Sequence, residues 1–360
     1  MAKRTIGKPR FYADILQYLK AKGYYGGTTS HPSSINPEKI WDMNPYQKTF
    51  IDNTLTNFII NNPSKQLDEL MANLTGLTTS GIYCGVFNHG YVQPPEFDVE
   101  DIDYNNNPIG FLFSDSSGTV SPEFESIVNW GYWANGFGLP QYKGYSLANV
   151  TGFNAALDSI SAFSFYPQNN EGDVGCVSYG RWFEPPHSFD VKSARVSTSY
   201  SGIDAATTPG GSTLTQTNYL KKSWGNLPAW TLEKQTGHDY NVGADRGIRE
   251  WGVSLEYLSD EDVFSKAGNE NKFFTWTDQE TDTSGTPEYV FDESMASFFK
   301  LTLNGSLPFI FCPNSSGSDP DNEDGETDLE FAICRISKPP VFRQVSNGVF
   351  STKLTITEVM

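Results

Sequence analysis

Alternation of apolar and polar residues is the clearest pattern along this chain. Residues 250–257 alternate without a break, with apolar side chains at the odd positions: Trp251, Val253, Leu255 and Tyr257. A period of two places these side chains on one face of a β-strand. Residues 350–360 alternate in the same way and predict another half-buried strand. Apolar runs predict further strands at 81–91, 162–166, 174–183, 191–200, 308–312 and 330–336.

Three short segments have helical spacing instead. In residues 11–22, Tyr12, Ile15, Leu16 and Leu19 share one helix face, and Gly23 is placed to end the helix. Residues 292–303 begin with Asp292, a residue suited to cap a helix, and carry apolar side chains at helical spacing. Residues 64–74 are the third helix candidate.

Composition supports a β-rich chain. Aromatic residues make up 14% and charged residues only 19% of the sequence, and much of the remainder is Gly, Ser, Thr, Asn and Pro. Aromatic side chains suit a pleated face, while Gly and Asn accept turn geometry. The sequence therefore predicts a mainly β protein, a β-sandwich or barrel with a packed α-helix.

We expect three regions along the chain. Residues 1–50 would form a basic N-terminal helix and an extended arm; the alternative for 24–50 is a surface loop packed on its own domain. Residues 51–186 would form a β-sandwich of the jelly-roll or carbohydrate-binding type. Pro185–Pro186 marks the boundary to a second β domain, 187–360, whose helix lies near 292–303.

The net charge of −18 argues against nucleic acid as a partner, because phosphate contacts need Lys and Arg. Residues 1–50 differ, with eight Lys or Arg against three acidic residues. This basic segment could dock on the acidic face of an identical neighbour, or it could be a solvated end. Under the first alternative the residues of an inter-subunit arm would be Lys8, Arg10, Phe11 and Tyr12.

Membrane and redox features are few. No apolar run is long enough to span a membrane, and the basic first residues lack the apolar run of a secretory signal. Each of the four cysteines lies in an apolar stretch: Cys84, Cys176, Cys312 and Cys334. We therefore expect buried free thiols. Cys312 and Cys334 are the one pair that could face each other on neighbouring strands.

No catalytic motif is present, so we expect no enzyme, no catalytic residue and no cofactor. The four histidines lie far apart and outside any metal-binding or nucleophile motif: His31, His89, His187 and His238. A glycosidase carboxylate pair stays open, because its two members are set by the fold and not by sequence spacing.

Two segments suggest binding chemistry. The acidic run 319–328 has the oxygen ligands of a calcium loop but lies between predicted strands, so a solvated hairpin tip is favoured and no metal is expected. Trp130, Tyr132 and Trp133 could stack on the sugar rings of a host surface glycan. A role in filling the core is the favoured alternative for these three rings.

The order of several segments resembles minor tail proteins of tailed bacteriophages, of the distal-tail or baseplate-hub type. These segments span most of the chain: Lys8–Leu19, Cys84–Gly90, Arg181–Asp190, Thr208–Thr213, Trp224–Trp230, Arg249–Leu258, Leu307–Pro313 and Lys353–Val359.

This resemblance implies a tail-tube-like β domain with a packed helix and an outward-facing, jelly-roll-like domain. It implies a homo-oligomeric ring, hexameric or dodecameric, that contacts other phage tail proteins in a virion assembled in the host cytoplasm. The family offers no catalytic residues to carry over. A head or neck decoration protein, a carbohydrate-binding adhesin and a glycan depolymerase are the alternatives.

Overall fold

Antiparallel β-strands make up most of the part of the chain that the structure describes. The structure is a computed structural model, and each predicted strand overlaps a strand in it. The described residues are 8–45, 47–52, 54–61, 81–87, 109–115, 119–120, 122–128, 146–153, 160–167, 172–190, 194–199, 203–207, 210, 213–217, 248–264, 294–313 and 331–359. The predicted helix at 64–74 lies outside them.

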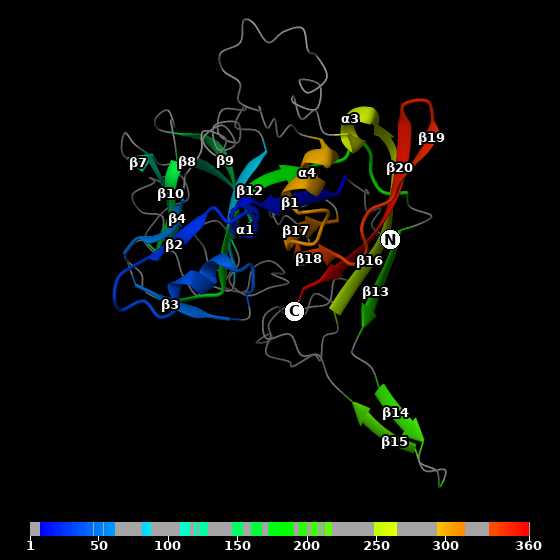
Figure 1. Ribbon diagram of the computed structural model, residues 1–360, viewed down its shortest axis with the longest axis horizontal. Helices are drawn as coiled ribbons and strands as arrows, with labels where there is room; N and C mark the ends of the chain where they lie inside the picture. Colours follow the sequence, from blue (N-terminus) through cyan, green and yellow to red (C-terminus); the bar gives the residue numbers. More distant parts are fainter. Residues whose placement is uncertain are drawn as a thin grey trace, which may run out of the picture.

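One large sheet runs through the molecule (Figure 1). Its strand order is β13 (Arg195–Ser199), β16 (Ile248–Ser259), β20 (Val349–Glu358), β18 (Ala332–Ile336), β17 (Phe309–Cys312), β1 (Arg10–Asp14), β12 (Cys176–Phe183), β5 (Ile82–Phe87), β9 (Ser146–Phe153) and β8 (Pro122–Val128). An eleventh strand, β19 (Phe342–Ser346), pairs with β20 on the same edge as β18, and the sequence pattern did not predict it.

The N-terminal strand lies in the middle of this sheet. β1 pairs on one edge with β12, where Phe11 lies opposite Phe183, and on the other edge with β17, where Phe11 lies opposite Phe311. The predicted helix start at residue 11 is therefore wrong. Both edges of β1 are hydrogen-bonded to neighbours, and this pairing outweighs the helical spacing of its apolar residues.

The predicted region boundaries do not divide the sheet. β12 ends just before Pro185–Pro186, yet it is joined through β1 to β17, which belongs to the predicted domain 187–360. Residues 24–50 also pack on the protein instead of extending as an arm. In this segment Ile40, Trp41 and Met43 are almost completely buried.

A smaller sheet covers one end of the large one. It is ordered β2 (Tyr25–Thr29), β4 (Thr56–Ile60), β10 (Ile160–Pro167), β6 (Ile109–Asp115) and β7 (Thr119–Val120). The 3₁₀ helix η1 (Pro37–Trp41) helps to join the two sheets: the Trp41 ring lies 5.6 Å from Phe163 of β10, which lies 5.1 Å from Tyr179 of β12. Aromatic rings therefore fill the space between the layers.

Two further strand pairs complete the described sheets. β3 (Thr49–Ile51) pairs with β11 (Gly172–Val174). The hairpin of β14 (Ile203–Thr207) and β15 (Thr213–Thr217) projects away from the rest of the molecule in Figure 1. The predicted turn at 208–212 lies between these two strands in the sequence, and all of it except Gly210 is outside the described residues.

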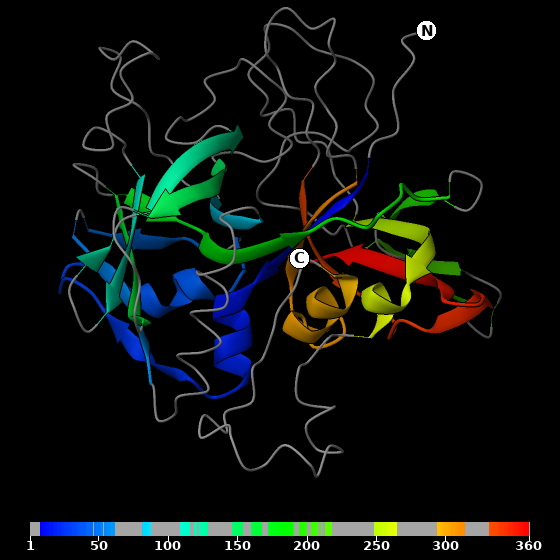
Figure 2. The same cartoon turned by 90° about the horizontal axis from the view of Figure 1, so that it is seen from above.

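Three short helices lie along one side of the strands in Figure 2: α1 (Ile15–Ala21), α3 (Asp260–Val263) and α4 (Met295–Leu301). α4 confirms the helix predicted near 292–303, but its N-cap is Ser294, whose side chain accepts a hydrogen bond from the Ser297 N–H. The side chain of Phe298 on α4 anchors the helix to the large sheet. Its ring lies 5.0 Å from Phe11 and 5.1 Å from Phe309.

A bulge changes the face of one predicted core residue. The pairing of β16 with β20 shifts register between Leu255 and Leu258, and Tyr257 there has a positive φ of 61°. Tyr257 is consequently 67% exposed, whereas Leu258 is completely buried. The alternation therefore placed Trp251, Val253 and Leu255 correctly and Tyr257 wrongly, because a bulge inserts one extra residue into the period of two.

Replacing Gly180 by alanine should destabilise the sheet. A Cβ atom at Gly180 would lie 1.9 Å from the carbonyl oxygen of Ala13, a backbone atom of the neighbouring strand β1. Either strand must shift, and overpacking of this kind typically costs about 1–3 kcal/mol. Chemical denaturation of the Gly180→Ala variant measures the loss. Gly210→Ala is the matched control, because no atom lies within 4 Å of its added Cβ; an equal effect in both variants would contradict the packing account.

Candidate functional site

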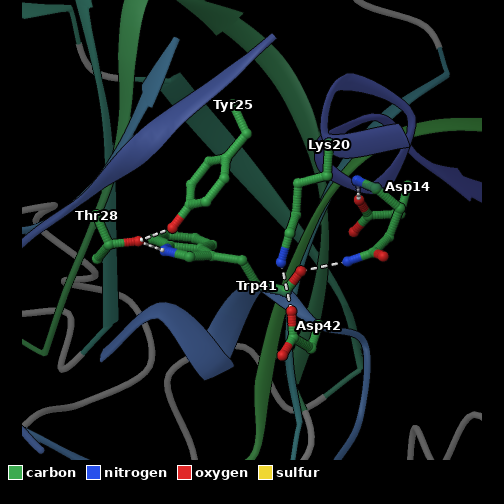
Figure 3. Close-up of polar contacts among 7 residues, drawn as sticks. Asp14, Lys20, Tyr25, Thr28, Trp41 and Asp42 are labelled. Atoms are coloured by element: carbon green, nitrogen blue, oxygen red, sulfur yellow. Dashed lines mark hydrogen bonds and ion pairs between the residues drawn. The ribbon is translucent and has the colours of Figure 1, made fainter. Parts of the chain in front are cut away.

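A polar network joins helix α1 to η1 and β2 (Figure 3). The Gln17 side chain donates a hydrogen bond to the carbonyl oxygen of Trp41, and the Lys20 ammonium forms an ion pair with Asp42. The Trp41 indole N–H donates to the Thr28 hydroxyl at 3.2 Å, and the Tyr25 hydroxyl lies 2.6 Å from the same oxygen. These contacts fix the position of residues 25–42 on the body of the protein.

A second polar cluster lies inside the large sheet. Asp14, the last residue of β1, is 2% exposed and caps α1: its Oδ1 accepts a 2.7 Å hydrogen bond from the Gln17 N–H. Its Oδ2 atom is buried without a hydrogen-bond partner among the described residues. Nearby on the same face of the sheet, the hydroxyls of Tyr83 and Ser178 lie 2.8 Å apart and are both buried.

Burial dominates the electrostatics of this cluster. It raises the pKa of Asp14 to about 7, against the smaller lowering effects of the Ser178 hydroxyl and of the Gln17 N–H. The pKa of the Tyr83 phenol is also raised, first by burial and second by the Asp14 carboxylate. The cluster can therefore hold or release one proton near neutral pH, at Asp14, inside a packed sheet.

The polar residues proposed for an inter-subunit arm contact the chain itself. The Arg10 guanidinium donates from Nε to Oε2 of Glu184 at 2.9 Å and lies 4.3 Å above the Trp182 ring. Lys8 Nζ lies 3.6 Å from the other Glu184 oxygen. Trp182 in turn donates from its indole N–H to Asn149 Oδ1 at 3.1 Å.

Phe11 and Tyr12 are buried, which corrects the expectation that they lie on an arm. They are 0% and 1% exposed in β1, and the Tyr12 ring lies 5.0 Å from the ring of Tyr83. An arm that reached a neighbour with these two side chains would have to leave the centre of the large sheet. That movement would break two strand pairings, so these rings serve the core.

The other predicted binding residues are not brought into a site by the described part of the chain. Trp130, Tyr132 and Trp133 lie outside the described residues, and so does the acidic run 319–328. Within the described ranges, no group of three or more His, Cys, Asp or Glu side chains is arranged to hold a metal ion.

All four cysteines are free and buried, as the sequence predicted. Cys312 and Cys334 lie on the paired strands β17 and β18, but the register places Cys334 opposite Phe309 and leaves the two cysteines offset. Burial raises the pKa values of the Cys84 and Cys176 thiols, so both stay protonated and unreactive at neutral pH.

Comparisons with known proteins do not identify the chain. Searches of protein-family models, of curated protein sequences and of solved structures found no match. Among the described residues, no helix is long and apolar enough to cross a membrane. The functional interpretation therefore depends on the sequence pattern and on the surfaces and clusters described above.

Proposed function

We propose that this chain is a structural subunit of a tailed bacteriophage particle. Its place would be a ring in the tail, of the distal-tail or baseplate-hub type, joining the tail tube to the tip or adsorption apparatus. The sequence resemblance motivates this role. The observation that supports it best is the central position of β1, which joins strands from both halves of the chain into one antiparallel sheet.

A subunit that transmits force along a tail must not separate into parts. Here the chain is tied together by backbone pairing on both edges of β1 and by the aromatic rings that α4 packs against β1 and β17. Close-packed aromatic cores deform little, and each ring adds a large buried area. These features suit a rigid virion subunit.

The finer architecture belongs to the same proposal. We assign the tail-tube-like layer to β16, β20, β18 and β17 with α4 packed on them. The outward, jelly-roll-like part would be the smaller sheet packed against β12 and β5. Here the two parts share the large sheet and are not separate domains.

The mass of the purified chain tests the proposal. Light scattering should report a discrete oligomer, and negative-stain images of the same fraction should show closed rings. Deletion of the N-terminal segment is unsuitable as a test of assembly, because it would remove β1 and α1 from the core. A glycan depolymerase would instead release reducing ends from host polysaccharide, and that result would contradict a purely structural role.

A further inference from the structure

The outer face of five strands gathers exposed basic side chains. Opposite residues of an antiparallel pair point to the same face of a sheet. On β20, Lys353 is exposed between the buried Thr352 and Leu354, so its side chain points outward. Ser351, Thr355 and Thr357 of β20 point to the same face as Lys353, because alternate residues of a strand share a face. The register then adds three cations to this face: Arg343 lies opposite Ser351, and Arg335 lies opposite Thr357. Arg195 lies opposite Gly252, which in turn pairs with Thr355.

We call this surface the basic face; its cations are Arg195, Arg335, Arg343 and Lys353, and the register also places Glu250, opposite Thr357, on it. Its strands lie at one side of the molecule in Figure 1. All four side chains are exposed. Among the described residues, these four cations form one ion pair, between Arg195 Nη2 and Glu250 Oε1 at 3.9 Å. The Arg195 side chain is nevertheless 74% exposed.

The edge of the basic face adds apolar surface. Val341 and Val345 are 66% and 69% exposed and flank Arg343 along the chain. Among the described strands β19 pairs with β20 alone, so its second edge has unpaired backbone groups. Large exposed apolar side chains beside arginine are the composition that protein–protein interfaces favour.

We propose that the basic face binds an acidic surface of a second copy of this chain. The inference rests on the proposed function, because it names the contact between neighbouring subunits of the proposed ring. Charge complementarity argues for this occupant: each copy carries a net charge of −18, while the basic face has the opposite sign. Opposite potentials steer two surfaces together and disfavour wrong partners.

The sign of the charge also fixes the type of contact. A twofold contact would bring two basic faces together, and their like charges would repel. The basic face must therefore meet a different surface of the neighbour, head to tail. Head-to-tail contacts generate a ring when their rotation closes and a filament when it does not.

Charge reversal on the basic face tests the inference. The variant Arg335→Glu/Arg343→Glu/Lys353→Glu changes three exposed positions of the basic face. Lys22→Glu/Lys39→Glu/Lys48→Glu is the matched control, with the same charge change at the C-cap of α1, on η1 and just before β3. Both variants and the wild type would be compared by thermal melting and by analytical ultracentrifugation at low and high salt.

The inference predicts an oligomeric wild type whose association weakens with salt. The basic-face variant should associate at least about tenfold more weakly, while the control should match the wild type and all three should melt alike. An undiminished oligomer in the basic-face variant would overturn the inference and leave the proposed function standing. A monomeric wild type would overturn both the inference and the proposed function. If that monomer were retained on heparin, the basic face would be assigned to binding an anionic polymer instead.

Discussion

Replacing Glu358 by alanine should cost about 3–5 kcal/mol in the free energy of unfolding, because it removes a buried carboxylate that pairs with the buried guanidinium of Arg249. Glu358 and Arg249 lie at the ends of the neighbouring strands β20 and β16, and both side chains are 3% exposed. Arg249 donates from Nε and Nη2 to the two carboxylate oxygens, each at 3.0 Å. Its backbone N–H donates to Oε2 at 3.1 Å as well.

A double variant separates the net contribution of the ion pair to the free energy of unfolding from the loss caused by removing one partner. Arg249→Met/Glu358→Leu removes both charges of the pair and should be clearly more stable than Glu358→Ala, because the guanidinium is removed together with its carboxylate partner. Urea denaturation of the single and double variants provides the coupling energy. The exposed pair Arg195–Glu250 is the control, and its loss should cost less than about 1 kcal/mol. Single and double variants with simply additive losses would contradict this account.

Asp14→Asn should stabilise the protein increasingly as the pH rises from acid to weakly alkaline. The folded pKa of Asp14 is about 7, whereas the ordinary value is 3.8. The folded state therefore holds its proton more tightly than the unfolded chain. The contribution of Asp14 to stability is fully present below the ordinary pKa and is lost as the pH rises through the folded pKa.

The expected size follows from the shift in pKa. A difference of about three units corresponds to roughly 4 kcal/mol between acid and weakly alkaline solution. Asparagine keeps an oxygen to accept the Gln17 N–H and carries no charge at any pH. Urea denaturation of both proteins across this pH range would measure the difference directly.

Asp173→Asn is the control for this series, because Asp173 is exposed on β11. Its stability curve should run parallel to that of the wild type. If the Asp14→Asn curve also ran parallel to the wild type, burial of Asp14 would not govern the pH dependence of the protein.

Strands were predictable where alternation was regular. β16 and β20 followed from a period of two, because the large apolar side chains of each strand are buried on one face. β1 was not predictable, because its apolar residues run directly into those of α1 and fit a helix equally well. Only pairing with β12 and β17, strands far away in the sequence, decides for an extended backbone there.

The polar clusters were harder to predict than the fold. Asp14 precedes an apolar helical run, so the capping role of its side chain was visible in the sequence in principle. Asp14 lies beside Ser178 of β12 and Tyr83 of β5, and no local pattern contains that information. The same holds for Arg249 and Glu358, which are 109 positions apart and meet through strand pairing alone.

The copy number of this chain in virions tests the central proposal most directly. Tailed particles would be purified from the host in which the encoding phage grows, and the chain would be quantified by mass spectrometry against isotope-labelled peptides. The proposal predicts a fixed copy number of six or twelve per particle, in the tail fraction. Absence of the chain from purified particles would contradict it.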